Sequence, residues 1–370
     1  MKVEVCCVFN YAPHYRTEIY LLMEKELMCD FYFGAETGSR IRKMDYSLFK
    51  NVPKELKYHK LIYHFNWLSG AIGLTFKPYK RYIITGEPFC LSTWGLLLLN
   101  YIQGKKSYFW THGWYGDETR AKRFVKRIFF SISDGIFLYG NYARDLMIKE
   151  GFKKKKLFVI YNSLKYSVQL AQRSTLTKSR VFKSRFRNSL PVVTFIGRVE
   201  PKKKLDMILY ALTHSLKTYN VGFNICLIGD GSDQDNLQML ASKLGVEKYL
   251  WFYGASYDEQ LLANLIYNSD VCIAPGEVGL MAIHSLTFGT PVISHNHFVS
   301  QGPEFEAISD GVTGTFFEKG NIEDLSKTLS KWLTEHSPKT EKLAEQCYRI
   351  IDEKYNPNYQ IELLRKVIGE

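Results

Sequence analysis

Short apolar runs alternate with amphipathic stretches along most of the chain. The runs are rich in β-branched and aromatic residues, as buried strands are, and the stretches between them repeat apolar residues at helical spacing. In the first half we expect strands at Val3–Phe9, Phe31–Phe33, Arg81–Thr85, Ser107–Thr111, Gly135–Tyr139 and Leu157–Tyr161, and helices at Thr17–Met28, Ser92–Ile102, Lys122–Ser131 and Tyr142–Glu150. This order predicts an α/β fold with a parallel sheet covered on both faces.

The alternation stops at Ser163–Pro191, which is polar, basic and rich in serine and threonine. It then resumes with strands at Val192–Ile196, Gly222–Ile228, Leu250–Tyr253, Val271–Ala274 and Thr313–Phe317, and with helices at Leu205–Lys217, Gln234–Leu244, Glu259–Tyr267, Ile322–Leu333 and Asn358–Ile368. We predict two Rossmann-like domains, 1–165 and 186–354, joined by a linker at about 166–185. The final helix, about 355–370, is expected to cross back to the first domain.

Length and composition agree with this division. A chain of 370 residues suits two domains of roughly 150 to 200 residues. No apolar run reaches the roughly 18 residues that span a bilayer, and the N-terminal run lacks the form of a signal peptide, so we expect a cytoplasmic protein. Seven cysteines are an odd number and no Cys/His cluster has metal-ligand spacing, so we expect reduced core cysteines and no bound metal.

The net charge of +12 favours anionic partners. No recognition helix, zinc finger or RNA-binding aromatic motif accompanies the basic clusters, so nucleic acid is not an expected partner. One predicted helix, around 120–130, mixes five cations with four large apolar residues. Two interpretations stay open for it: the helix lies on an anionic membrane at the inner face of the cell membrane, or it packs its apolar side on the sheet and solvates its charges.

The strongest candidate for a ligand-binding segment is 274–294, whose sequence is APGEVGLMAIHSLTFGTPVIS. It predicts a glycine-bearing loop, a short helix that ends before Gly289 and Pro291, and a buried strand. Free backbone amides near Gly279 and Leu280 and the positive end of the helix dipole favour an anion there. The segment therefore predicts a phosphate site.

Three earlier strands of the same domain end in comparable turns. Arg198 follows the first strand and Lys203 comes five positions later, Gly229 begins a glycine-rich turn, and Tyr253 to Ala255 close the third strand. Carboxyl ends of parallel strands meet at one sheet edge, where ligands bind. Arg198 and Lys203 suit a diphosphate held without a metal, and a solvated basic loop is the alternative.

This series of strand-end motifs resembles the donor domain of retaining GT-B glycosyltransferases of family 4. The motifs that carry the resemblance appear in the family's order between residues 197 and 317 and read GRVEPKKKLDMIL, LIGDGSDQDNL, FYGA, NSDVCIAPGEVGLMAIHSLTFGTPVI and PEFEAISDGVTGTFF. The resemblance implies that Arg198 and Lys203 bind the diphosphate of a nucleotide sugar and that Tyr253 to Ala255 border the base. It also implies a GT-B architecture of two Rossmann-like domains facing across a cleft. Beyond the co-substrate, with UDP favoured over GDP, no cofactor is expected.

One motif departs from this family. Family members carry two glutamates separated by seven residues, of which the first contacts the sugar and the second the ribose. Here Gly276 stands at the first position and His284 at the second, with Glu277 one residue late. Glu277 either contacts the sugar or caps the helix, and His284 either serves the donor site or is structural.

The first domain offers fewer family features. His112, which precedes a glycine after a middle strand, matches the family histidine that faces the donor sugar. Trp114 and Tyr115 follow it and either stack on sugar rings or pack in the loop, and Asp117 and Glu118 are acid candidates or solvated charges. The first loop lacks the family's glycine pair, and its candidates for the acceptor side are His14 and Arg16, the latter in place of the lost phosphate contact.

We therefore expect a glycosyltransferase that moves a sugar from a nucleotide diphosphate to a hydroxyl of a glycan or lipid-linked oligosaccharide, with retention, in surface polysaccharide biosynthesis. His112 and Glu277 would act as the catalytic residues by orienting the sugar's hydroxyls, while Arg198 and Lys203 stabilise the leaving diphosphate. Two alternatives stay open: a nucleotide-sugar epimerase on the same fold, and a non-catalytic relative that binds glycans or membranes.

Overall fold

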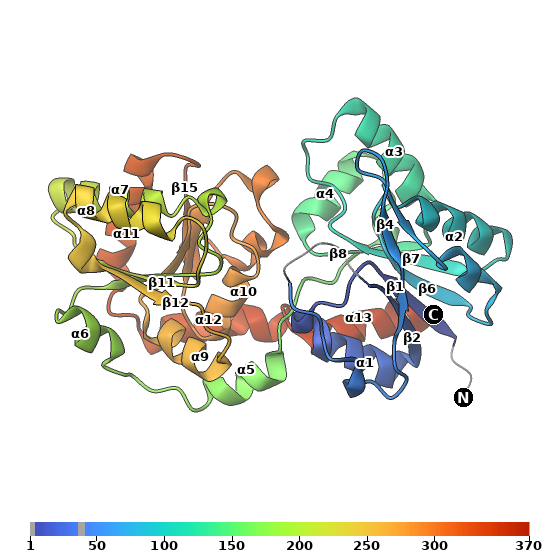
Figure 1. Ribbon diagram of the computed structural model, residues 1–370, viewed down its shortest axis with the longest axis horizontal. Helices are drawn as coiled ribbons and strands as arrows, with labels where there is room; N and C mark the ends of the chain where they lie inside the picture. The colour runs from blue at the N-terminus through green and yellow to red at the C-terminus, as the bar shows by residue number, and fades with distance from the viewer. Residues whose placement is uncertain (1–3, 36–40, 370) are drawn as a thin grey trace. The chain divides into compact units, whose positions relative to one another are not determined.

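The computed structural model describes residues 4–35 and 41–369 and divides the chain into two units (Figure 1). The first unit comprises Met1–Lys165 together with Asn356–Glu370, and the second comprises Tyr166–Tyr355. Val3, the expected start of the first strand, lies outside the described residues.

The first unit is built on a parallel sheet of seven strands. Their order is β3-β2-β1-β6-β7-β8-β9, so the direction of strand addition reverses between β1 and β6. The strands are β1 (Val5–Phe9), β2 (Cys29–Gly34), β3 (Lys54–Leu56), β6 (Arg81–Thr85), β7 (Lys106–Thr111), β8 (Gly135–Leu138) and β9 (Leu157–Val159). A small antiparallel hairpin, β4 (Tyr58–Lys60) with β5 (Asn66–Leu68), was not predicted because strands of three residues are too short to show a clear apolar alternation.

Helices cover both faces of this sheet, as expected. α1 (Thr17–Leu27) and α13 (Pro357–Gly369) pack on one face, and α2 (Leu91–Ile102), α3 (Arg120–Ser131) and α4 (Asn141–Lys149) on the other. Strand β1 shows why both faces must be covered: Cys7 and Phe9 belong to the core under α1 and α13, while Cys6 and Val8 belong to the core under α2 and α3.

The second unit contains a parallel sheet of six strands in the order β12-β11-β10-β13-β14-β15, which reverses between β10 and β13. The strands are β10 (Val192–Ile196), β11 (Asn224–Ile228), β12 (Leu250–Gly254), β13 (Val271–Ala274), β14 (Val292–His295) and β15 (Gly314–Phe317). The main helices are α7 (Asp206–Thr218), α8 (Gln234–Leu244), α9 (Glu259–Asn268), α10 (Met281–Thr287), α11 (Ile322–His336) and α12 (Glu341–Glu353).

Residues 166–185, expected to form a linker, instead belong to the second unit. They form α5 (Tyr166–Arg173) and most of α6 (Val181–Phe186), whose two phenylalanines pack edge-on against Trp251. Arg173 donates two hydrogen bonds to Asp352 of α12, at 3.1 and 2.8 Å. These helices escaped prediction because few apolar residues, set among basic ones, anchor them.

The C-terminal helix α13 belongs to the first unit and lies beside α1, although the two come from opposite ends of the chain (Figure 1). Gln360 accepts a hydrogen bond from Ser163 Oγ at 2.7 Å and donates one to the carbonyl of Tyr161 at 3.0 Å. Tyr359 Oη donates to the carbonyl of Val159 at 3.2 Å. These side chains attach α13 to the chain just after β9.

The seven cysteines are all free and buried. None of the helices in the described part of the chain is long and apolar enough to cross a membrane. The described residues also contain no group of three or more histidine, cysteine or acidic side chains placed to hold a metal ion.

A buried lysine just before α12 binds α9 and the turn before β14. Lys339 is 6% exposed, and its Nζ donates hydrogen bonds to the carbonyl of Tyr267 at 2.8 Å and to Thr290 Oγ1 at 2.5 Å. Burial lowers the pKa of the Lys339 ammonium to about 7. The folded second unit thus releases this proton far more readily than the unfolded chain does.

The stability of the second unit is expected to depend on this proton. An unfolded lysine has a pKa of about 10.4, so between about pH 7 and pH 10 the unfolded state binds more protons and the free energy of unfolding rises with pH. Lys339→Met should flatten that rise in urea denaturation measured across this range. Lys342→Met, which removes an exposed cation of α12, is the matched control and should keep the wild-type slope. Equal slopes in all three proteins would contradict the assignment.

Candidate active site

In the second unit the candidate donor residues lie at the carboxyl ends of neighbouring strands. Arg198 and Lys203 follow β10, and the loop with Gly276 and Glu277 follows β13. These are the two strands between which the strand order reverses. The loops leave such a point in opposite directions and open a crevice, which is where open parallel sheets bind ligands.

Lys203 joins the two loops. Its backbone carbonyl accepts a hydrogen bond from the amide of Gly276 at 3.1 Å, and its Nζ donates one to the carbonyl of Glu277 at 2.9 Å. Burial lowers the pKa of the Lys203 ammonium, and the Glu277 carboxylate acts in the opposite direction. Lys203 therefore positions the loop after β13, and its ammonium group lies at the carboxyl ends of β10 and β13.

Arg198 is the more accessible of the two cations. Its side chain is 55% exposed, and its guanidinium forms an ion pair with Glu200 at 2.9 Å. Lys202 binds the other oxygen of the same carboxylate at 3.2 Å. Because exposed ion pairs are weak, a diphosphate can draw Arg198 away at small cost.

Gly276 occupies a position that tolerates no side chain. A Cβ atom there would lie 2.6 Å from the carbonyl oxygen of Lys202 and 3.0 Å from Cα of Lys203. The first glutamate of the family pattern is therefore sterically excluded by the loop after β10. Glu277 carries the nearest carboxylate in sequence, and its side chain is exposed.

A second carboxylate, which the sequence did not reveal, converges on Glu277. A Cβ atom placed on Gly302 would lie 3.3 Å from Glu277 Oε1 and 2.8 Å from Glu304 Oε2. Glu304 is 4% exposed and lies in a 3₁₀ helix, Pro303–Ala307. The spacing of Glu277 and Glu304 in the sequence could not predict that they lie close together, because their proximity depends on the tertiary fold.

The remaining donor candidates lie at the same edge but differ in what they contribute. Gly229 permits close contact of two turns, because a Cβ there would lie 1.8 Å from the carbonyl oxygen of Gly197. Tyr253 packs its ring against Trp251 at 5.1 Å, and Ala255 is exposed just after β12. Gly279 has a φ of +53° and precedes Leu280 at the start of α10.

His284 is engaged in a hydrogen-bond network. Its Nε2 lies 2.8 Å from Oε1 of Glu259, the first residue of α9, and that same oxygen accepts a hydrogen bond from Gln169 at 2.6 Å. Phe288 packs against the imidazole at 5.4 Å. The position where the family has its second glutamate thus presents an imidazole paired with the carboxylate of another helix, and Glu259 was not predicted as a site residue.

The close packing at Gly276 gives a testable result. Gly276→Ala should displace the loop after β10 and lower the free energy of unfolding by about 1–3 kcal/mol in urea denaturation. Gly73→Ala, at a glycine with nothing within 4 Å of the added Cβ, is the control. Wild-type stability in Gly276→Ala would contradict the packing described.

The first unit holds a pocket of about 580 Å³ at the corresponding edge of its own sheet. Its wall combines the ends of β1, β6 and β7, so it too lies where the strand order reverses. Among the lining residues are Tyr11, Tyr15, Arg16, Glu87, His112, Tyr115, Asp117 and Tyr139. Aromatic rings beside a few polar groups are suited to a sugar.

His112 lies on this wall directly after β7. Its ring is accessible from the pocket and packs 4.7 Å from the ring of Tyr139 and 6.0 Å from that of Tyr115. Desolvation by the surrounding side chains, with the positive charges of Arg16 and Lys126, lowers the pKa of His112 to about 4. The imidazole is therefore neutral near pH 7 and presents one donor and one acceptor nitrogen.

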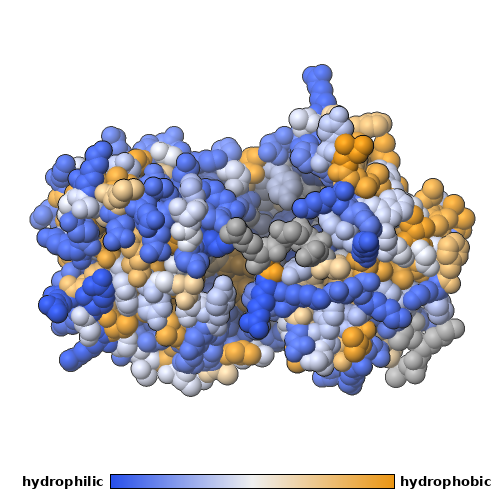
Figure 2. Space-filling view, in the orientation of Figure 1, coloured by the Kyte–Doolittle hydropathy of each residue, from blue (hydrophilic) through white to orange (hydrophobic). Residues whose placement is uncertain are grey.

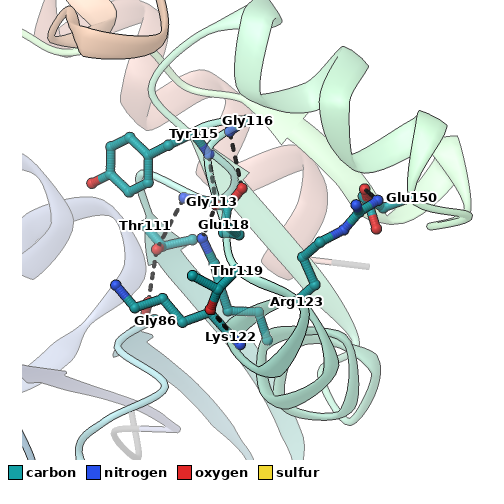
Figure 3. A network of polar contacts seen from close by, with 11 residues as sticks. Gly86, Thr111, Gly113, Tyr115, Gly116, Glu118, Thr119, Lys122, Arg123 and Glu150 are labelled. Atoms are coloured by element: carbon teal, nitrogen blue, oxygen red, sulfur yellow. Dashed lines mark hydrogen bonds and ion pairs between the residues drawn. The ribbon is translucent and has the colours of Figure 1, made fainter.

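Polar contacts fix the loop that carries His112 (Figure 3). Thr111 Oγ1 donates to the carbonyl of Gly86 at 2.7 Å, and Glu118 accepts from the amides of Tyr115 at 2.8 Å and Gly116 at 2.9 Å. Lys126 of α3 forms a buried ion pair with Glu118, with the two side chains 8% and 4% exposed. Glu118 is thus a structural anchor of the loop, while Asp117 lines the pocket.

The structure separates the predicted acceptor-side residues. Arg16 lines the pocket, donates a hydrogen bond to Tyr139 Oη and lies 5.4 Å from the ring of Trp110. Tyr115 lines it as well. Trp114 is 3% exposed, and its ring packs 6.0 Å from that of Phe152 in the core. It is therefore not available for stacking on a sugar. His14 is not among the lining residues and instead contacts the carbonyl of Arg42 at 3.2 Å.

One pocket carboxylate escaped the sequence analysis. Glu87 follows β6, is half-buried and accepts a hydrogen bond from Asn66 Nδ2 at 2.8 Å. Burial raises the pKa of its carboxyl, and the hydrogen bond opposes that shift. Its position just after a buried strand, beside Gly86, was the available signal.

The electrostatics of the pocket predict a low pKa for His112. Histidine-selective NMR titration should give about 4 for His112, identified by its loss in His112→Gln, and Arg16→Met should raise that value because it removes a positive charge. Lys25→Met, an exposed cation on α1, should leave it unchanged. A pKa near the ordinary histidine value, or one insensitive to Arg16→Met, would contradict this description.

Comparison with known proteins identifies the class of the second unit. Residues 177–350 match the family model described as glycosyl transferases group 1. These residues make up most of the second unit, which is therefore similar to group 1 glycosyltransferases. This match agrees with the enzyme class expected from the sequence.

Curated relatives agree over the same region. The chain is 28% identical over 161 residues to the lipopolysaccharide core biosynthesis glycosyltransferase LpsE of Rhizobium meliloti, covering 44% of each protein. It is 29% identical over 150 residues to the D-inositol 3-phosphate glycosyltransferase of Mycolicibacterium smegmatis, covering 38% of this chain and 32% of that protein. The chain thus matches less than half the length of these relatives.

Solved structures extend the likeness to both units. The lipopolysaccharide outer core galactosyltransferase WaaB shows a TM-score of 0.71 at 15% identity, covering 99% of each chain. Anabaena HepE in complex with UDP shows a TM-score of 0.72 at 14% identity, covering 99% of this chain and 100% of HepE. This likeness shows that the chain has the GT-B fold, as predicted.

Proposed function

We propose that the chain is a retaining glycosyltransferase that moves a sugar from a nucleotide diphosphate, with UDP favoured, to a hydroxyl of a glycan or lipid-linked acceptor. The observation that carries the proposal is the junction at Lys203, which joins the loops after β10 and β13 beside Arg198. Two cations at adjacent strand ends suit the two phosphates of such a donor. That WaaB and LpsE are named for lipopolysaccharide core synthesis supports a role in surface polysaccharide assembly.

Each donor-site residue has a distinct task in this proposal. Arg198 exchanges its ion pair with Glu200 for the diphosphate, and the Lys203 ammonium neutralises charge that grows on the leaving group. Glu277 faces the transferred sugar, with Glu304 beside it. His284 and Glu259 face the ribose as a hydrogen-bonded pair. No metal is needed in this scheme, because the two cations supply the positive charge.

The first unit supplies the acceptor side. His112, neutral near pH 7, accepts or donates a hydrogen bond at a sugar hydroxyl without adding charge. The rings of Tyr115 and Tyr139 and the carboxylate of Glu87 line the same pocket. For the proton that the acceptor hydroxyl loses, the proposal assigns the leaving phosphate as the base.

Removing both cations tests the proposal. Arg198→Ala with Lys203→Ala should weaken UDP binding in calorimetry by at least about tenfold, because two charge-assisted contacts are lost, and should abolish turnover of UDP-sugars. Lys202→Ala, which removes a neighbouring exposed lysine, is the matched control. Unchanged turnover in the double variant would overturn the proposed donor site.

A product assay separates the retaining transferase from an epimerase and from a non-catalytic module. Incubation with a panel of UDP- and GDP-sugars, followed by proton NMR, shows whether the first anomer released or transferred keeps the donor's configuration. An epimerase would convert the donor sugar without releasing UDP. A non-catalytic module would bind glycans and release nothing from any donor. Either result, or inversion at the anomeric carbon, would contradict the retaining transferase.

A further inference from the structure

The exposed large apolar side chains of the described residues are unevenly distributed. Most belong to the first unit, and several lie on two neighbouring helices, α2 and α3. Figure 2 shows apolar surface in the region that these helices occupy in Figure 1. Contiguous apolar surface on a protein usually marks a binding surface.

Helix α3 is apolar on two sides. Phe129 and Phe130 are buried against the sheet, as an ordinary covering helix requires, but Phe124 is 67% exposed and Ile128 is 42% exposed. Packing on the sheet therefore accounts for only part of the apolar pattern. The outer pair, one helical turn apart, is left without a role in the core.

Helix α2 extends this outer apolar surface. Leu91, Leu98, Tyr101 and Ile102 recur at helical spacing and are 40%, 56%, 73% and 69% exposed. The two helices are neighbours on one face of the sheet, because the rings of Trp94 in α2 and Phe129 in α3 lie 5.0 Å apart and both helices contribute to the same core. Their outer sides consequently point away from the same sheet face.

The charge on these helices has one sign. Neither contains an aspartate or glutamate, and α3 contains five cations. Lys126 is buried with Glu118, Arg123 pairs with Glu150, and Lys122 lines the pocket of the first unit. Arg120 and Arg127 are exposed on the side of Phe124 and Ile128. Arginines beside exposed phenylalanine and isoleucine match the phosphates and the acyl boundary of an anionic bilayer.

We propose that the outer face of α3 and the adjoining outer face of α2, here called the docking face, bind the surface of a bilayer that contains anionic phospholipid. Phe124 and Ile128 enter the boundary between headgroups and acyl chains, and Arg120 and Arg127 contact lipid phosphates. The binding is peripheral and needs no spanning helix. It depends on neither the donor site nor catalysis, so it stands apart from the transferase proposal.

Vesicle co-sedimentation of the full chain tests the proposal. We expect binding to vesicles of phosphatidylglycerol and phosphatidylcholine, little binding to phosphatidylcholine alone, and loss of binding as salt is raised, since exposed charges are screened. Phe124→Ser with Ile128→Ser, and separately Arg120→Gln with Arg127→Gln, should each weaken binding by about tenfold or more.

Met239→Ser with Tyr257→Ser is the matched control, because these side chains of the second unit are 64% and 86% exposed. The control should bind vesicles as the wild type does, and all variants should keep the far-UV circular dichroism and the urea midpoint of the wild type, which shows that they are folded. The proposal is overturned if the wild type shows no preference for anionic vesicles. Wild-type binding by either α3 variant, or an equal loss in the control, would overturn it as well.

Discussion

The reversal of strand order within each parallel sheet is the constraint on which the rest of this structure depends. β1 pairs with both β2 and β6, and β10 pairs with both β11 and β13, so the chain leaves the centre of each sheet in two directions. Loops that diverge at a strand end cannot fill the space between them. The candidate donor residues and the pocket of the first unit both lie at such points.

Within the second unit, one lysine both connects the two loops of the candidate donor site and gives that site a positive charge. Lys203 binds the loop after β13 through its backbone and its side chain, so the position of Glu277 depends on the loop that carries Arg198. The first unit has a parallel arrangement, in which the buried pair of Glu118 and Lys126 ties the loop of His112 to α3. In both units a buried or half-buried cation fixes the geometry of a loop.

Periodicity in the sequence was sufficient for strands that are buried on both sides and for regularly amphipathic helices. β6, β10, β13 and α8 begin and end where the pattern of apolar residues places them. It failed where burial is partial, as in the hairpin of β4 and β5 and in α5 and α6. Here a few apolar contacts made across long sequence distances stabilise the element, and a local pattern does not report them.

The same limit applies to the site residues. Motif spacing singled out Arg198, Lys203 and His112 as candidates, and the structure has Arg198 and His112 just after buried strands and Lys203 in the 3₁₀ turn that follows β10. It could not find Glu259 or Glu304, whose surroundings come from neighbours distant in the chain, whereas Glu87 comes just after a buried strand and was overlooked. The sequence left Trp114 open between stacking on a sugar and packing in the loop, since it does not say whether a ring after a strand end turns outward or into the core; in the structure the ring is buried.

The absence of a side chain at Gly276 has a consequence for how this donor site can change over evolutionary time. Any larger residue there meets the carbonyl oxygen of Lys202, so a single exchange of Gly276 for glutamate does not by itself restore the paired-glutamate pattern. The loop after β10 has to move before a glutamate can be accepted. An exchange between the two forms of the site therefore requires coordinated changes in two loops.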